Sequence, residues 1–186
     1  MKVKLLEVYH FWFSKKNDYD KWFLNSNKYD LYITTHFKSL LDYYIRNYKT
    51  INLSEYSFKE LVSLLILFDQ FTRQIYRDTA KAYSMDFIAI DITRYILEQK
   101  LLSIYSENEQ LFILLPLQHS ENINDLDLLL YLLYELDNNK LFLHHTIEHK
   151  KVLEKWGRYP KRNKYLNRES SPEEIIYIEE NNDRDY

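Results

Sequence analysis

The chain has 186 residues, a formal net charge of −3 and no cysteine. This length is typical of one domain and suffices to bury a hydrophobic core without metals or disulfides. The lack of cysteine excludes a disulfide framework, a thiolate zinc site and a cysteine nucleophile, and it is typical of a reducing compartment, so we predict a cytoplasmic protein. The negative charge disfavours general nucleic-acid binding, and no apolar run approaches the roughly 18 residues of a membrane span, so we predict no membrane association.

The sequence has few residues that break helices, and patterns typical of helices begin at the N-terminus. The sequence contains one glycine and three prolines, whereas parallel-sheet and barrel folds usually need many turn glycines. We expect a first helix within residues 1–13, and apolar side chains spaced by threes and fours from Phe37 to Tyr48 predict an amphipathic helix there. Ser57 and Glu60 form a capping-box pattern ahead of an apolar run, which predicts a nearly wholly buried helix.

The middle of the chain repeats these signals. Ser84 is a candidate N-cap for an apolar stripe over residues 88–96. Ser106 and Glu109 form a second capping-box pattern, and Pro116 is expected to bend or end the helix that follows.

Two further helices and a last short one are predicted in the C-terminal part. Apolar periodicity over 126–136 and 142–156 marks the two helices, and Gly157 follows as the residue that ends the second. Ser171 and Glu174, with a proline between them, predict the start of the last helix.

These elements predict an all-α protein of about eight helices with short connections. Stacked antiparallel helix pairs are expected, either as a compact bundle or as a solenoid-like arrangement. We expect one helical domain over residues 1–180 and a polar tail over 181–186. The longest irregular segment, 158–170, has the length of loops that are often functional.

A dense polar group follows the most apolar helix. Asp69, Arg73 and Arg77 are spaced by fours and share one face if the helix continues, so Asp69 can pair with Arg73 as a structural ion pair. The alternative is an anion clamp, in which two guanidinium groups bind a carboxylate or phosphate while Asp69 orients one of them. We include the neighbouring Gln70 among the candidate ligand contacts.

Histidines supply the candidates for acid and base chemistry. His119 and Glu121 follow a buried helix, where they either cap its end or face a cleft as catalytic groups. His149 falls on the inward stripe of its helix, as a hydrogen-bonded core residue or as a catalytic one. These residues and Asp69 could supply nitrogen and oxygen ligands to a metal, but no metal-binding spacing such as HExxH supports this, so we predict neither a metal nor a cofactor.

The segment 150–168 is strongly basic. The segment contains many lysines and arginines and a single acidic residue. Aromatic residues at 156, 159 and 165 lie between these charges in the sequence, and their rings are of the kind that stack on nucleic-acid bases. A solvated helix face followed by a basic loop is the commoner explanation, so nucleic-acid binding is not expected.

Several motifs together resemble the family called domain of unknown function 924. They are FWF at 11–13, WF at 22–23, FDQFTRQIYRDTAKAY at 68–83, LPLQHSE at 115–121 and HKKVLEKWGRYPKRNKYLNRESSPEE at 149–174. The resemblance covers nearly the whole chain and implies an all-α, tetratricopeptide-like fold found chiefly in bacteria. It implies no reaction. Positions that match the family's motifs are Asp69, Gln70, Arg73, Arg77, His119, Glu121, His149, Arg158, Arg162 and Asn163.

The sequence departs from the family's pattern at several of these motifs. Thr72, Gln74 and Asp78 differ from the usual residues of the first motif, and Lys161 stands where a second histidine is common. Because several arginines and histidines stand at positions expected to face inward or into a cleft, we predict a pocket that binds a small anionic ligand, either as a binding site or as an enzyme of unknown reaction, with Arg73, Arg77, Arg158, Arg162 and Asn163 among its contacts. The alternatives are a scaffold that binds a protein partner and, less favoured, RNA binding through 150–168.

Overall fold

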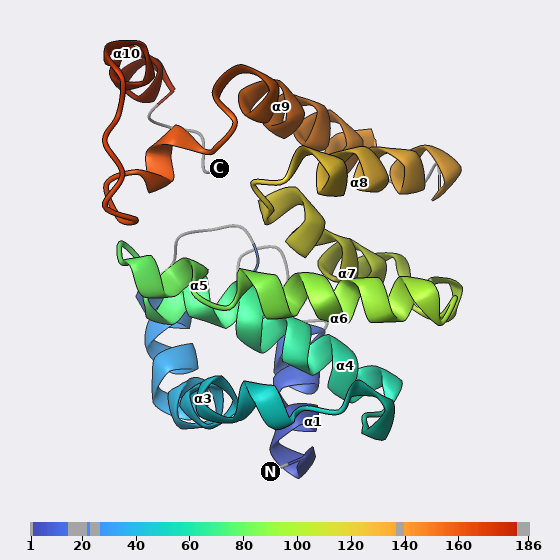
Figure 1. The fold of residues 1–186 in the computed structure, drawn as a ribbon. Coiled ribbons are helices and arrows are strands. Elements are labelled where there is room, and N and C mark those ends of the chain that lie inside the picture. The colour runs from blue at the N-terminus through green and yellow to red at the C-terminus, as the bar shows by residue number, and fades with distance from the viewer. Residues whose placement is uncertain (1, 15–21, 23–26, 137–139, 182–186) are drawn as a thin grey trace. The chain divides into compact units, whose positions relative to one another are not determined.

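The computed structural model describes residues 2–14, 22, 27–136 and 140–181 (Figure 1). These residues form helices, turns and loops, and no strand occurs among them. The α-helices are α1 (Lys2–Trp12), α3 (Asn27–Asn47), α4 (Phe58–Leu65), α5 (Thr72–Ile75), α6 (Asp86–Glu98), α7 (Glu107–His119), α8 (Ile123–Leu136), α9 (Lys140–Trp156) and α10 (Pro172–Glu180). A π-helical segment, Ile66–Phe71, joins α4 to α5. If these three are counted as one continuous helix, eight helices are bounded within the described ranges, which confirms the predicted all-α fold.

The chain divides into two compact units, Met1–Ile113 and Leu114–Tyr186, and each is described separately below. The boundary falls within α7. The single domain expected over 1–180 stays a prediction, and residues 182–186 of the expected tail and Phe23 of the WF motif lie outside the described residues. Among the described helices, none combines the length and apolarity that crossing a bilayer requires.

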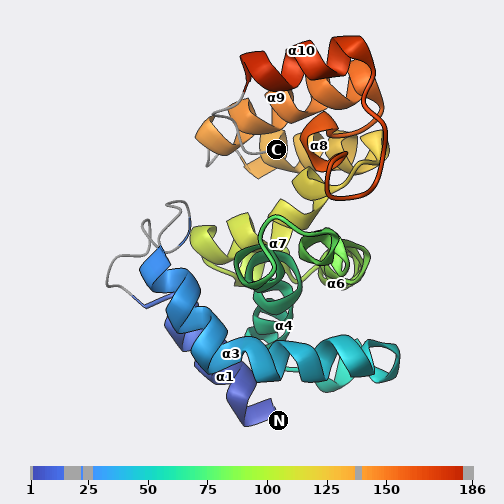
Figure 2. The same cartoon turned by 90° about the vertical axis from the view of Figure 1, so that its left-hand side faces the viewer.

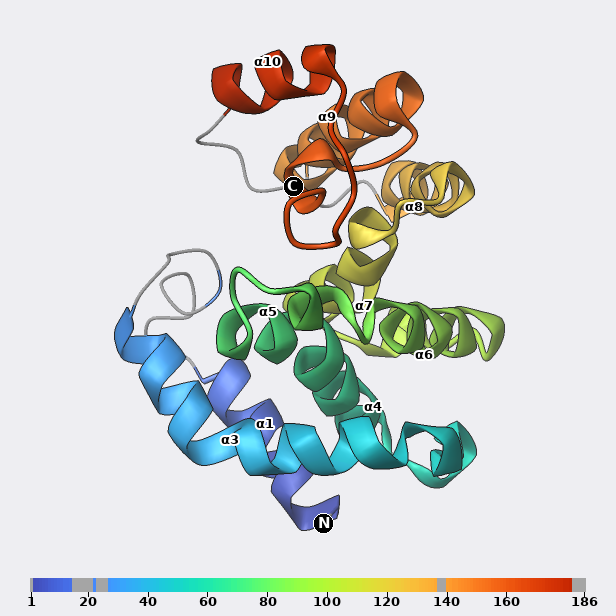
Figure 3. The ribbon, with the colours of Figure 1, turned by 60° about the vertical axis from the view of Figure 1, so that its left-hand side comes forward.

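In the first unit, α1 packs against α4, while α3 packs against α5 and the π-helical segment (Figure 3). The capping box that begins α4 is present, since the Ser57 backbone amide donates to Glu60 Oε2 at 2.8 Å. All residues from Leu61 to Leu65 are buried, which confirms the predicted buried helix. The Trp12 ring packs edge-on against Phe71 and Phe112, with centroids 5.6 and 5.3 Å apart.

The structure corrects one expectation about helix ends and narrows another to a single alternative. Ser84 does not cap α6, which begins at Asp86 with Met85 in the N-cap position; the Ser84 hydroxyl instead donates to the Lys81 carbonyl at 2.8 Å. The Ser84 hydroxyl therefore bonds to the short 3₁₀ turn Ala80–Tyr83 and does not cap α6, as the sequence pattern had predicted. Of the two alternatives for Pro116, ending the helix is excluded, because α7 continues past it to His119, and a bend at this proline stays a prediction.

In the second unit, α8 and α9 lie side by side (Figure 1). α10 lies beside α9 (Figure 2), and the rings of Trp156 and Tyr177 pack with centroids 5.7 Å apart. Gly157 ends α9 with φ +67°, a left-handed conformation that glycine adopts without steric cost, as predicted. The capping box of Ser171 and Glu174 at the start of α10 is also confirmed.

Candidate functional site

The first unit contains a buried charged group built around Arg73. Arg73 Nη1 lies 3.1 Å from Asp69 Oδ1, and the two guanidinium nitrogens donate to both carboxylate oxygens of Asp86 at 2.9 and 3.0 Å. Asp69 is 1% exposed and belongs to the π-helical segment. Burial acts to lower the pKa of Arg73, but the carboxylates of Asp69 and Asp86 outweigh it and raise that pKa. The predicted structural ion pair between Asp69 and Arg73 is therefore confirmed, with Asp86 as a third member.

The other residues of this motif have partners in the same unit. Arg77 Nη2 lies 2.9 Å from Asp30 Oδ2 of α3, in a pair that is considerably more exposed than that of Arg73. Gln70 Nε2 donates to Asp69 Oδ2 at 2.6 Å. The anion clamp stays a prediction, and these intramolecular contacts favour the structural explanation of the motif.

The second unit contains a polar group that we call the imidazole cluster: Gln118, His119, His149, Tyr159 and Arg162. The end of α7, the inward face of α9 and the loop after α9 supply its members. The Tyr159 hydroxyl donates to the Gln118 carbonyl at 2.6 Å and lies 3.2 Å from His149 Nδ1. Arg162 Nη1 donates to the His119 carbonyl at 2.8 Å, and its guanidinium carbon lies 4.4 Å from the centroid of the Tyr159 ring.

The members of this cluster are largely shielded from solvent. Tyr159 is 0% exposed, Arg162 4% and His149 7%, while His119 is half-buried. The His149 ring meets the Tyr159 ring edge-on, with centroids 5.4 Å apart. Tyr159 therefore contacts both the imidazole and the guanidinium, and it fixes their relative positions.

The protonation state of His149 follows from these contacts. The pKa of His149 is lowered to about 3, mainly by burial and in addition by the nearby His119, Arg162 and His145, against a hydrogen bond to the Gln118 backbone that raises it. The imidazole is consequently neutral near pH 7. The Tyr159 hydroxyl has one hydrogen, which it donates to the Gln118 carbonyl in the short bond, and its oxygen lies 3.2 Å from His149 Nδ1.

We expect His149 to remain neutral throughout the range from about pH 5 to pH 8. Because its folded pKa of about 3 lies below the ordinary value of 6.5, protonation favours the unfolded state, and this contribution to stability falls as the pH drops from about 6.5 toward 3. Nitrogen-15 NMR of the imidazoles, with His149→Gln to assign the signal, measures this directly. A His149 resonance that titrates near pH 6.5 would contradict the assignment.

The loop after α9 is held by two bidentate ion pairs. Arg168 contacts the two oxygens of Glu121 at 2.6 and 3.0 Å, and the Tyr159 backbone amide donates to the same carboxylate at 2.8 Å. Burial acts to raise the pKa of Glu121, but the hydrogen bonds from Arg168 and Tyr159 dominate and lower it. Both oxygens are thus engaged as an anion, which favours a structural role for Glu121 over acid or base chemistry.

Arg158 and Glu174 form the second of these pairs. Arg158 Nε and Nη2 each donate to Glu174 at 2.8 Å. Asn163 Nδ2 donates to Ser170 Oγ at 3.0 Å and lies 3.4 Å from Glu174 Oε2. Arg158 and Asn163 therefore contact the start of α10, and their predicted ligand contacts stay predictions.

The structure gives little support to RNA binding through 150–168. Lys150 lies 2.6 Å from Asp127, Lys151 lies 2.7 Å from Glu148, and Arg158 and Arg168 are paired as described. The ring of Tyr159 is fully buried and cannot stack on a base.

Among the described residues, no group of three or more histidine, aspartate or glutamate side chains is arranged to hold a metal ion.

The predicted site residues therefore fall into separate groups. His119, His149 and Arg162 come together in the imidazole cluster, and Glu121 joins it through the Tyr159 amide. Asp69, Gln70, Arg73 and Arg77 belong to the first unit. The sequence interpretation missed Tyr159 and Arg168 as organising residues, although both lie in the loop that it singled out by length.

Comparisons with known proteins agree on this chain's relationships. Residues 8–182 match the family model described as "Bacterial protein of unknown function (DUF924)". A solved structure of a protein of unknown function from Agrobacterium tumefaciens is similar, with 30% sequence identity and a TM-score of 0.86, over 96% of this chain and 98% of that one. No curated protein matches the chain.

Proposed function

Because the chain belongs to the DUF924 family of bacterial proteins of unknown function, whose description assigns no reaction, we propose a function from the geometry: the chain binds a small anionic ligand at the imidazole cluster. Arg162 supplies the positive charge, and His119 and His149 supply neighbouring polar groups. The observation that carries this proposal is the burial of the Arg162 guanidinium at 4% exposure beside a buried neutral imidazole.

Physical chemistry supports such a role for Arg162. A guanidinium removed from water attracts an anion much more strongly than an exposed one, because solvent screens the interaction less. The ring of Tyr159 and the carbonyl of His119 hold its plane in place, so little side-chain entropy is lost on binding. Buried polar groups of perturbed pKa that converge on one place are typical of binding sites.

We expect phosphate or small carboxylates to raise the melting temperature of the wild-type chain, and Arg162→Gln to abolish this shift. The reason is that a ligand that binds only the folded state stabilises it by an amount that grows with the logarithm of its concentration relative to the dissociation constant. Thermal-shift titration and calorimetry measure the effect.

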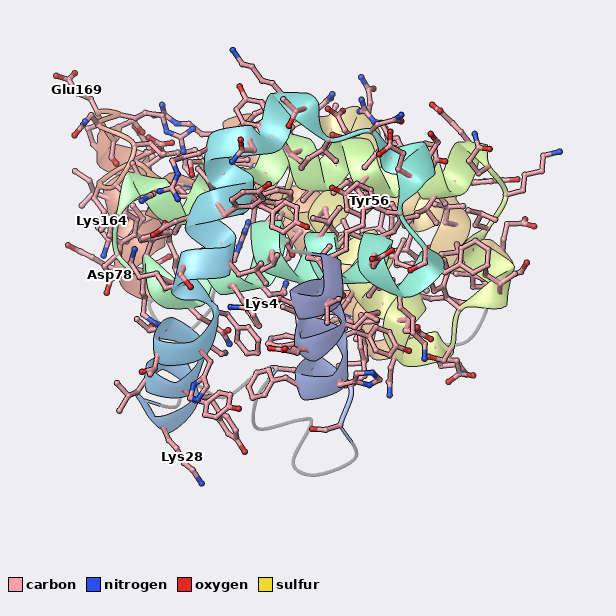
Figure 4. The ribbon with its side chains drawn as sticks, turned by 90° about the horizontal axis from the view of Figure 1, so that it is seen from below. Lys4, Lys28, Tyr56, Asp78, Lys164 and Glu169 are labelled. Carbon is pink, nitrogen blue, oxygen red and sulfur yellow. The ribbon has the colours of Figure 1, made fainter. Side chains whose placement is uncertain are left out.

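Lys164→Gln is the matched control, because it removes one positive charge from the same loop at an exposed position that points outward (Figure 4). This variant should bind the anion almost as the wild type does. An equal loss in both variants would indicate a general attraction to the basic segment and would contradict the proposed site.

A scaffold that binds a protein partner stays a second prediction. It is favoured by Tyr131 and Tyr134, which lie three residues apart on α8 with 61% and 64% of their surface exposed. A partner bound at these two tyrosines would leave the buried polar residues of the imidazole cluster unexplained. The anion-binding proposal explains more features of this unit and is therefore preferred.

A further inference from the structure

One face of α8 carries exposed tyrosines and carboxylates in a row. Positions 127, 131, 134 and 135 follow one another at spacings of three and four residues, which place side chains beside one another on a helix. Tyr131 and Tyr134 have 61% and 64% of their surface exposed, and Glu135 is exposed as well. Asp127 lies one turn before Tyr131, with 51% of its side chain exposed. We call these four residues the tyrosine row.

Three members of the tyrosine row take no polar or aromatic part in the fold. Within the part of the chain that the structure describes, the side chains of Tyr131, Tyr134 and Glu135 form no hydrogen bond, ion pair or ring contact. Asp127 has one partner, Lys150 of α9, whose Nζ lies 2.6 Å from Asp127 Oδ1. Exposed tyrosines are enriched where proteins contact one another. The row is therefore a surface that is free to receive a partner.

The charge of the row determines which partner fits. The sequence of α8, INDLDLLLYLLYEL, contains aspartate and glutamate but no lysine, arginine or histidine. Asp125 is buried and accepts a hydrogen bond from Ser120 Oγ at 2.6 Å, so the exposed charges of the helix are those of Asp127 and Glu135. Both are negative. A positive side chain is attracted to the face of an exposed tyrosine ring and to a carboxylate, so the row favours a basic partner.

Arginine suits this surface better than lysine does. Its planar guanidinium can stack on a tyrosine ring and also donate two hydrogen bonds to a carboxylate, whereas lysine offers a single compact charge. Tyr131 and Glu135 are four residues apart, so one guanidinium can reach both of them. Tyr134 adds a second ring beside the first.

A second copy of α8 fits the same surface poorly. If two α8 helices pack antiparallel about Tyr131, the Glu135 of each copy lies opposite the Asp127 of the other. Like charges in such positions repel, and this repulsion disfavours pairing of the row with itself. The charge pattern thus favours a different, basic chain as the partner.

We propose that the tyrosine row docks a basic segment of another protein, with an arginine guanidinium stacked on the Tyr131 ring and bonded to the Glu135 carboxylate. The four residues of the row do not belong to the imidazole cluster, so this interaction does not depend on the proposed anion binding. It gives the partner a stated chemistry, an exposed segment that carries arginine.

Titration of the nitrogen-15-labelled full chain with short peptides tests the proposal. Three peptides of alanine and serine, blocked at both ends, carry two arginines, two lysines or two citrullines; citrulline keeps the planar shape of arginine without its charge. The arginine peptide should shift the backbone signals of residues 127–135 and bind roughly threefold or more tightly than the lysine peptide. The citrulline peptide should show no measurable binding.

Variants of the row should weaken binding without affecting the fold, because exposed positions away from buried contacts tolerate substitution. Tyr131→Leu combined with Tyr134→Leu should lower the affinity for the arginine peptide about tenfold, since each exposed cation–π contact contributes a factor of roughly three. Glu135→Gln should lower it about threefold. Glu179→Gln is the matched control, because it removes the same charge from an exposed position of α10, and it should leave the affinity unchanged.

Three results would overturn the proposal. The first is an absence of binding by the arginine peptide. The second is an equal loss in Glu135→Gln and Glu179→Gln, which would indicate a general attraction to an acidic protein. The third is self-association of the wild-type chain in sedimentation that Tyr131→Leu removes, which would assign the row to a second copy. Phosphate titration of the same variants tests the anion site separately, since none of them alters the imidazole cluster.

Discussion

Replacing Arg73 with methionine is expected to lower the free energy of unfolding by about 3 kcal/mol. Methionine keeps much of the side chain's apolar volume and removes the charge, so Asp69 and Asp86 lose the guanidinium that both of them contact. Asp69 has only 2% of its side chain exposed, so water cannot take the place of the lost partner. The value lies at the lower end for such pairs because Arg73 and Asp86 are 21% and 16% exposed.

Arg77→Met is the matched control for this measurement. It removes the same charge from the same sequence motif, but the pair of Arg77 with Asp30 has 40% and 22% of its side chains exposed. Exposed pairs contribute less than about 1 kcal/mol, so urea denaturation should show a small change for Arg77→Met and a large one for Arg73→Met. Equal changes would contradict the structural role assigned to the Arg73 group.

The second large effect is expected for Glu174→Ala, which should destabilise the chain by about 2 kcal/mol. The change removes the capping box at the start of α10 and the carboxylate that both nitrogens of Arg158 contact. Glu173→Ala is the control, since Glu173 is exposed and contacts the Ser171 hydroxyl instead. That variant should leave the urea denaturation curve nearly unchanged.

The same carboxylate gives a pH dependence that can be measured. The hydrogen bond from Arg158 holds the pKa of Glu174 at about 2, below its ordinary value of 4.5. The folded state therefore binds fewer protons, and the stabilisation is fully present above pH 4.5 and is lost as the pH falls through about 2. Glu174→Ala should show less of this acid-induced loss, and an unchanged acid-unfolding curve would argue against the pair.

Much of the helical fold is predictable because its signals are local. The capping boxes at Ser57, Ser106 and Ser171 each depend on a glutamate three residues later, and all three are present in the structure. Gly157 ends α9 through its own backbone freedom. Such features need only a few neighbouring residues, so the sequence contains all the information they require.

The partners of the charged residues are not predictable in the same way. Arg73 finds Asp86 in another helix, and Arg168 finds Glu121 at a distance of 47 residues along the chain. The spacing along one helix predicts Asp69 as a partner of Arg73. The second partner, Asp86, is brought to Arg73 only by the packing of another helix. Ser84 is an example of a local signal that failed: it has the side chain of a suitable cap, but its hydroxyl bonds to a neighbouring 3₁₀ turn.

The π-helical segment Ile66–Phe71 bears on how this motif is compared between related chains. A π turn holds one residue more than an α turn, so the positions before and after it belong to two different phases of helical rotation. A relative that lacks one residue in this stretch would have the later side chains of the same helix turned by about 100°. To decide whether a relative directs the arginine that corresponds to Arg73 toward two carboxylates, the number of residues in the stretch 66–71 is therefore as informative as their identity.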